Sequence, residues 1–461
     1  MPEPKEFILG LMKMMAAKDF DAASFGESET FAKIVENQAL MNTYRQEDAP
    51  EVLSYWEERG LIKQLHDTEA IYTKWASYLP KSYVDDPTCG RTYPLLFVMH
   101  GSGNPIYLAE TYGYTSIAAR EELIVIIPED ETPENIDKLF AYAREHYPVD
   151  WTRVYMVGYS LGGFMTSRHA MRWPERFAAV GSGGMLFANG PSTPHVQAGK
   201  VWPGENTTPE MVRRAAHYKI PACICMSEQE VLGLLPVTQD EPVNQWAEHL
   251  SEEEKKRTEG KSEPRQEDRI DLSGRNKIQS INNWRIANGC TSVNEAAVRK
   301  AAASTANIVE EKIGFPFEKT SVITRENRSH FVGDSVSEDG ETYFRTIALA
   351  KSPHWPSQAL AELTWEFISQ FAVDPETGIS YKIKGCPPKG SGFVMPVFQE
   401  AIVSQEIFDA ARGIHSGRRR EDLHHPRPGI RLRPGGQCGV WDHMSRTPDG
   451  TSHHRGSAFC V

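Results

Sequence analysis

The 461-residue sequence lacks an uninterrupted apolar run long enough to cross a bilayer, so we expect no membrane-spanning helix. It also lacks a basic surplus, because 50 Lys and Arg face 62 Asp and Glu and the formal net charge is −12. An acidic surface disfavours nucleic acids and anionic membranes as partners, and we expect neither. With 40% hydrophobic and 24% charged residues, the chain can bury a substantial core.

Cysteine is scarce, with seven scattered residues. A secretory leader is not expected either, since Met1–Phe20 has acidic residues before its apolar part and Lys13 inside it. Both observations predict a cytoplasmic protein without a disulfide framework. Cys223 and Cys225 fall in a predicted strand, but no second Cys or His pair with zinc-like spacing lies nearby. We therefore predict that the two cysteines are buried among apolar side chains and that there is no metal site.

Composition divides the chain into three regions. Apolar residues at helical spacing, as in Val52–Leu65, predict a helical N-terminal extension over 1–66. Strand and helix patterns alternate through 67–383, which predicts an α/β domain with a mostly parallel central sheet and helices on both faces. Within it, 236–272 is rich in both acidic and basic residues, which predicts a solvent-exposed, partly disordered loop. The alternative is a lid over the site. Pro, Gly, Arg and His dominate 384–461, which predicts a disordered tail.

The clearest chemical motif is GYSLG at 158–162, which fits G-x-S-x-G. A predicted strand at 154–157 precedes it and a predicted helix follows. Ser160 would occupy the sharp turn between them, where Gly158 and Gly162 leave room around it. The positive end of the following helix would face developing negative charge. This context predicts the nucleophile of a serine hydrolase with the α/β-hydrolase fold.

A second motif, HGSGN at 100–104, follows the short buried strand predicted at Tyr93–Met99. Small residues at this position let the backbone approach a substrate oxygen. We expect the backbone N–H groups of Ser102 and Leu161 to form an oxyanion hole. The alternative, a phosphate-binding glycine loop, lacks the required glycine spacing.

The base of such a site follows the acid in chain order. His354 lies between the predicted strand Thr346–Lys351 and the last predicted helix, where the base belongs, and we predict that it is the base. His330 is the alternative, but it lies in a polar stretch that predicts a surface or turn position.

The acid should follow the strand predicted at Ala222–Met226, where Glu228 and Glu230 both occur. A carboxylate is needed because the imidazolium formed in the reaction requires a fixed partner. Glu228 lies only two residues beyond the strand, and Glu230 lies deeper in the loop. Asp334 is a further candidate, so the residues alone leave the acid open.

Three segments together resemble the polyhydroxybutyrate-depolymerase and feruloyl-esterase group of α/β hydrolases, over about Tyr72 to Val373. They are GYSLGG, HGSGNP and HWPSQALAELTWEFISQF. Asn-Gly-Cys at 288–290 matches a helix end of that family, and a His before Trp-Pro is its base, as at His354. The resemblance aligns Glu230 with the family's acid, which is usually Asp.

The resemblance implies hydrolysis of carboxylic esters through an acyl-enzyme, without a cofactor. Small-molecule substrates are expected, such as acetyl or hydroxycinnamoyl esters of sugars, with a polyester possible in the family. Two alternatives stay open at this stage. One is a serine peptidase on the same fold, and the other is a binding protein that kept the fold without the activity.

Overall fold

The computed structural model of the chain describes residues 4–43, 50–68, 71–101, 106–186, 195–197, 200–202, 207–240 and 272–383. The predicted tail and almost all of the charged segment at 236–272 lie outside these residues, so neither disorder nor a lid is tested. In the described part, no helix is both long and apolar enough to cross a membrane.

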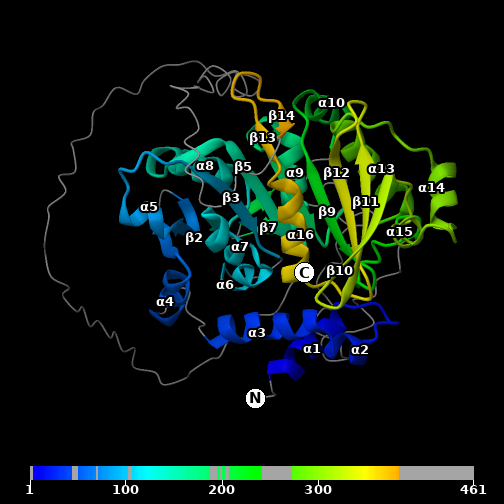
Figure 1. Cartoon of the computed structure of the whole chain (residues 1–461), viewed down its shortest axis with the longest axis horizontal. Coiled ribbons are helices and arrows are strands. Elements are labelled where there is room, and N and C mark those ends of the chain that lie inside the picture. Colours follow the sequence, from blue (N-terminus) through cyan, green and yellow to red (C-terminus); the bar gives the residue numbers. More distant parts are fainter. Residues whose placement is uncertain are drawn as a thin grey trace, which may run out of the picture. The chain divides into compact units, whose positions relative to one another are not determined.

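One sheet forms the centre of the domain (Figure 1). Its strands are β1 (Leu61–Thr68), β2 (Ile71–Pro80), β3 (Tyr93–Met99), β4 (Ile124–Pro128), β5 (Val149–Tyr159), β6 (Ala179–Gly183), β9 (Ala222–Ser227), β10 (Lys319–Arg325), β11 (Arg328–Val336) and β12 (Thr342–Leu349). They are arranged in the order β1-β2-β4-β3-β5-β6-β9-β12-β11-β10. The strands from β4 to β12 in this order run parallel, and antiparallel pairs flank them on both sides. This arrangement confirms the predicted α/β-hydrolase fold.

Helices cover both faces of the sheet. Apolar side chains on one face come from α4 (Pro50–Glu58), α6 (Ile106–Ala109), α7 (Tyr114–Glu121) and α16 (Gln358–Ile368). Those on the other face come from α8 (Pro133–His146), α9 (Leu161–Arg172), α10 (Pro209–Tyr218), α13 (Gly274–Ala287), α14 (Glu295–Ala302) and α15 (Ile308–Ile313). Strand β3 shows why its sequence is continuously apolar: Phe97 packs on the second face, while Leu96 and Val98 pack on the first.

Small elements complete the described domain. They are α5 (Lys81–Asp85), the 3₁₀ turns η1 (Glu110–Tyr112) and η2 (Pro174–Arg176), and the two-stranded pairs β7 (His195–Gln197) with β8 (Lys200–Trp202) and β13 (Phe371–Val373) with β14 (Ser380–Lys382).

The N-terminal extension consists of α1 (Pro4–Met14), α2 (Ala22–Gly26) and α3 (Glu29–Thr43). These helices form their own apolar cluster, with the side chains Ile8, Met12, Phe25, Phe31 and Ile34. Trp355, from the loop between β12 and α16, packs against this cluster. In Figure 1 the three helices lie together beside α6 and β10.

Two local predictions are wrong. The helix predicted over Val52–Leu65 ends at Glu58, because Gly60 adopts φ 86°, a conformation that glycine reaches without strain, and β1 then begins at Leu61. The polar stretch around His330 is strand β11, in register with Ile323 of β10 and Leu349 of β12. Its position between two strands, which the local sequence does not encode, decides its conformation.

Candidate active site

Ser160 lies at the turn between β5 and α9. Its backbone has φ 56° and ψ −119°, and a positive φ is strained for a residue with a side chain. The Ser160 N–H donates to the carbonyl of Gly183 at 2.8 Å, and its own carbonyl accepts from Phe164 at 3.0 Å. The strain is therefore held by hydrogen bonds to β6 and to the first turn of α9, and the residue remains partly exposed.

The glycines around Ser160 are required by close backbone approaches. A Cβ atom at Gly158 would lie 2.3 Å from the carbonyl oxygen of Gly162. A Cβ atom at Gly162 would lie 2.2 Å from the carbonyl oxygen of Met99, at the end of β3. No real side chain fits at such distances, so the turn can close only with glycine at both positions.

His354 and Glu230 are in direct contact. The Nδ1 atom of His354 lies 2.7 Å from Oε2 of Glu230, and both side chains are almost fully buried. Glu230 follows β9 and His354 follows β12, and these two strands are parallel neighbours. Their carboxyl ends therefore meet at the same edge of the sheet.

The His354 ring also lies close to the Ser160 turn. Its centroid is 5.1 Å from that of the Tyr159 ring. A Cβ atom at Gly184 would lie 2.7 Å from Cε1 of His354, and Gly184 follows the residue that binds the Ser160 N–H. Tyr159, at the end of β5, and Gly184, directly after β6, thus both lie against the imidazole.

Burial and charge act against each other at Glu230. Burial raises the pKa of its carboxyl group, while the contact with His354 and the cation of Lys277 lower it without cancelling the rise. Lys277 is itself fully buried on α13 and donates to the Gly233 carbonyl at 2.9 Å. Nothing in the sequence marks this lysine, because a lone lysine at a helix start usually points into solvent.

The other candidate carboxylates have different partners. Glu228 forms an ion pair with Lys312 at 2.7 Å. Asp334 binds Arg345 through both of its oxygens, at 2.7 and 2.9 Å. Neither has a hydrogen bond or ion pair with His354 among the described residues.

His330 does not lie on the surface, as its polar surroundings in the sequence had predicted. It is fully buried within β11, and burial lowers its pKa to about 4. His330 pairs with Leu349 at the end of β12, but β11 is four strands away from β5, the strand that leads to Ser160. No hydrogen bond or ring contact joins His330 to Ser160 or His354 among the described residues.

The oxyanion side of the site is described in part. Leu161 is the first residue of α9, where a backbone N–H has no carbonyl of the same helix to bind. Ser102, the other predicted donor, lies outside the described residues. Gly101, which precedes it, donates its N–H to the hydroxyl of Tyr112 at 2.7 Å. That tyrosine packs against Tyr159 with ring centroids 6.1 Å apart.

His100 connects the start of this loop to a buried acid. Its Nδ1 lies 2.6 Å from the carbonyl of Gly101 and its Nε2 lies 3.0 Å from that of Glu129. Carbonyl oxygens only accept, so an acceptor at each ring nitrogen favours the protonated form of the ring. Burial alone would lower the pKa of His100, but the Glu131 carboxylate at 4.0 Å and the two carbonyls outweigh it and raise the pKa. Burial raises the pKa of Glu131 to about 7.

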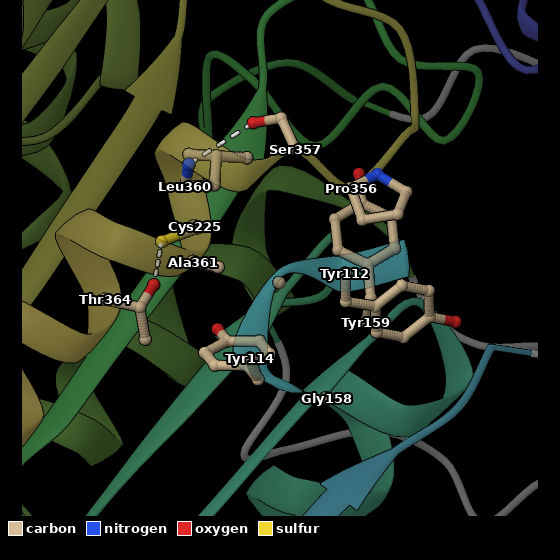
Figure 2. A pocket seen from close by; sticks show the side chains of 11 residues that line it. Tyr112, Tyr114, Gly158, Tyr159, Cys225, Pro356, Ser357, Leu360, Ala361 and Thr364 are labelled. Carbon is tan, nitrogen blue, oxygen red and sulfur yellow. Dashed lines mark hydrogen bonds between the residues drawn. The ribbon is translucent and has the colours of Figure 1, made fainter. Parts of the chain in front are cut away.

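A small cavity lies behind the Ser160 turn (Figure 2). Its volume is about 20 Å³, room for one water molecule and too little for an ester substrate. Figure 2 shows the rings of Tyr112, Tyr159 and Pro356 gathered on one side, with Cys225 and Thr364 across from them. The cavity thus lies between the start of α16 and the Ser160 turn, and it is too small to be the substrate site.

The described residues contain no group of three His, Cys, Asp or Glu side chains that could hold a metal ion. Cys223 and Cys225 are buried, with Sγ atoms 3.8 Å apart, and Cys225 lies 3.2 Å from the hydroxyl of Thr364. Both thiols pack between β9 and α16 and face away from water.

The N-terminal extension also reaches this site, which nothing in the sequence indicated. The carbonyl of Met15 accepts from the backbone N–H of His354 at 2.9 Å. Ala16 forms an isolated antiparallel bridge with Glu230. No motif marks these residues, because they act through their backbone.

Comparison with known proteins gives the following. No family model matches the chain, and no curated protein does. Solved structures that are similar include an acetyl xylan esterase from Aspergillus awamori, with 14% identity, a TM-score of 0.37, and coverage of 67% of this chain and 98% of that one. A ferulic acid esterase has 14% identity, a TM-score of 0.29, and coverage of 36% and 78%. An S-formylglutathione hydrolase from Agrobacterium tumefaciens has 16% identity, a TM-score of 0.26, and coverage of 36% and 76%.

Proposed function

We propose that this chain is a serine hydrolase that cleaves carboxylic esters through an acyl-enzyme on Ser160. The observation that carries the proposal is the contact of 2.7 Å between His354 and Glu230, buried beside the Ser160 turn. An acid that binds Nδ1 of a histidine fixes the tautomer in which Nε2 is free to accept a proton. This is the arrangement that an activated serine requires.

In the proposed reaction, Oγ of Ser160 attacks the acyl carbon and its proton passes to Nε2 of His354. The Glu230 carboxylate stabilises the imidazolium that forms. The imidazolium then returns the proton to the departing alcohol, which leaves an acyl-serine. Water then attacks the acyl-serine while His354 takes one of its protons, and the imidazolium returns that proton to Oγ of Ser160 as the carboxylic acid is released.

The negative oxygen of each tetrahedral intermediate needs donors that are already in place. We assign this role to the backbone N–H of Leu161, at the start of α9, and to that of Ser102. The ring of His100, held between the carbonyls of Gly101 and Glu129, fixes the position of Gly101 just before Ser102. Gly158 and Gly162 keep the turn narrow enough for Ser160 to project.

The expected substrates are small esters, with acetyl and hydroxycinnamoyl esters of sugars first. This follows from the resemblance of the GYSLGG and HWP segments to the depolymerase and feruloyl-esterase group. No cofactor takes part in the proposed chemistry, and the protein is expected to act in the cytoplasm.

The test is a panel of substrates with matched variants. The wild-type protein should hydrolyse p-nitrophenyl acetate and release acetate or ferulate from sugar esters. It should leave the corresponding p-nitroanilides nearly untouched, and Ser160→Ala should abolish turnover. Faster cleavage of the anilides would indicate a peptidase, and no turnover of any substrate by a folded protein would contradict the proposal.

A further inference from the structure

The segment Met15–Ala17 joins the two loops that carry the acid and the base. Met15 accepts two backbone hydrogen bonds at its carbonyl, from His354 at 2.9 Å and from Val231 at 3.3 Å. The N–H of Ala17 donates to the carbonyl of Gln229 at 2.9 Å. Ala16 lies between them in the antiparallel bridge to Glu230.

These contacts hold both members of the proposed catalytic pair. The bonds of Val231 and Gln229 hold the residues immediately after and before Glu230. The bond to the His354 N–H holds the backbone of the base itself. One carbonyl, that of Met15, therefore ties the acid loop to the base loop, although the loops are far apart in the sequence.

The segment is itself anchored by packing. On α1, Ile8 and Met12 are spaced by one helical turn and are both buried in the N-terminal cluster. Trp355, the residue after His354, packs against the same cluster. The apolar contacts of α1 thus fix where Met15 lies relative to His354.

Further bonds hold the extension to the β10–β11 turn. The hydroxyl of Thr30 donates to the carbonyl of Glu326 at 3.2 Å, and Arg328 donates to the carbonyl of Ser24 at 3.0 Å. Lys33 forms an ion pair with Glu326 at 3.4 Å. The extension therefore has its own attachment to the domain, apart from its contact with the acid and base loops.

We propose that the N-terminal segment Met15–Ala17 is a positioning element of the active site, which holds Glu230 and His354 in mutual contact. This inference rests on the proposed function for its effect on turnover, but the contact itself can be measured without activity. A loss of position of about 1 Å in a catalytic group costs on the order of 100-fold in rate, so loosening the segment should affect turnover strongly.

The experiment uses the full chain with two matched methionine substitutions on α1. Met12→Asp places a charge in the buried cluster, whereas Met14→Asp changes a side chain that is 46% exposed on the same helix. The first readout is the far-downfield proton resonance of the His354 Nδ1–H bound to a carboxylate. We expect it to be lost in Met12→Asp and kept in Met14→Asp and in Met12→Leu.

The second readout is the hydrolysis of p-nitrophenyl acetate. Met12→Asp should lower kcat by roughly 10- to 100-fold with KM within about threefold, since the segment acts on the acid–base pair. In a His354→Ala background the same change should cost less than about threefold, because the group it positions is gone. An equal loss in both backgrounds would indicate a general structural effect and would overturn the inference.

A second variant covers the case in which Met12→Asp does not fold. Ala17→Pro removes the N–H that bonds to Gln229 and leaves the buried cluster intact. It should likewise weaken the His354 resonance and lower kcat. If the resonance and kcat stay unchanged in the folded variants, the inference is wrong while the proposed function stands. If the resonance responds but the wild-type protein hydrolyses no ester, the inference holds and the proposed function fails.

Discussion

Oε2 of Glu230 lies 2.7 Å from Nδ1 of His354, and the two residues follow neighbouring parallel strands. One oxygen of the carboxylate accepts the hydrogen bond from Nδ1 of the imidazole. This bond orients the ring and leaves Nε2 for the reaction. The same carboxylate is buried beside the Lys277 cation, whose attraction offsets part of the cost of keeping a charge in the interior.

Replacing Glu230 by Gln should lower kcat for ester hydrolysis by on the order of 10⁴, with the fold intact. The amide keeps the shape of the side chain, but it cannot stabilise the imidazolium and it can favour the wrong tautomer of His354. Steady-state kinetics with p-nitrophenyl acetate, together with a thermal melt, provide the measurement.

The matched controls are Glu228→Gln and Asp334→Asn. Each removes one carboxylate charge without touching His354, because Glu228 pairs with Lys312 and Asp334 with Arg345. Both variants should keep kcat within about tenfold of wild type. A loss in either control as large as that in Glu230→Gln would show that the acid has been assigned wrongly.

Ser160→Ala and His354→Ala should each abolish most turnover, and the double variant should be little worse than either single one. The two groups act as a unit, so the cost of removing them is not additive. His330→Ala serves as the histidine control and should retain most activity in the fraction that folds, since His330 is buried in β11. If His330→Ala were inactive and His354→Ala active, His330 and not His354 would be the base.

Gly162→Ala should destabilise the turn. The added Cβ would meet the Met99 carbonyl oxygen at 2.2 Å, and backbone shifts of the kind needed to relieve such overpacking cost about 1–3 kcal/mol. Urea unfolding measures the loss, and esterase activity should fall with it. Gly10→Ala is the control, because nothing lies within 4 Å of a Cβ at that helical position and alanine favours a helix. Equal stability of both variants would contradict the close approach at the turn.

The buried Glu131 predicts a pH dependence of stability. Its pKa is raised from 4.5 to about 7 in the folded chain, so the folded state binds the proton more tightly than the unfolded state does. Its contribution to stability is fully present below pH 4.5 and is lost as the pH rises towards 7. The shift is worth roughly 3 kcal/mol, at about 1.4 kcal/mol for each pH unit.

Glu131→Gln removes this titration and keeps the side-chain shape. Urea unfolding between pH 5 and pH 7.5 should therefore show a smaller loss of stability in the variant than in wild type. Parallel pH profiles for the two proteins would mean that Glu131 is ionised throughout this range.

The sequence predicted the fold well where the strands are buried on both faces. Tyr93–Met99 reads as an unbroken apolar run because helices cover both sides of β3. The GYSLG motif could be recognised because its serine and glycines are consecutive in the sequence, although Gly162 is required by the distant Met99 carbonyl. His330 was misplaced because β11 is polar in sequence, and only its neighbours β10 and β12 make it a strand. A turn motif can be recognised from its own residues, whereas a strand such as β11 can be recognised only together with its partners.

At the candidate site, residues with chemical side chains could be found from sequence, and residues that act through the backbone could not. Strand order predicted His354 as the base, but it left the acid open among Glu228, Glu230 and Asp334, and only the family resemblance favoured Glu230. Met15 offers a carbonyl that every residue has, and its contact with His354 joins two segments that are far apart in the sequence. Lys277 was missed because a buried lysine looks like a surface one in sequence.

The most direct test of the proposed nucleophile is the mass of the protein after treatment with an alkyl fluorophosphonate, followed by peptide mapping. The proposal predicts a single adduct on the peptide that contains Ser160, absent in Ser160→Ala and formed far more slowly in Glu230→Gln. An adduct at another residue, or none on a folded protein, would contradict it.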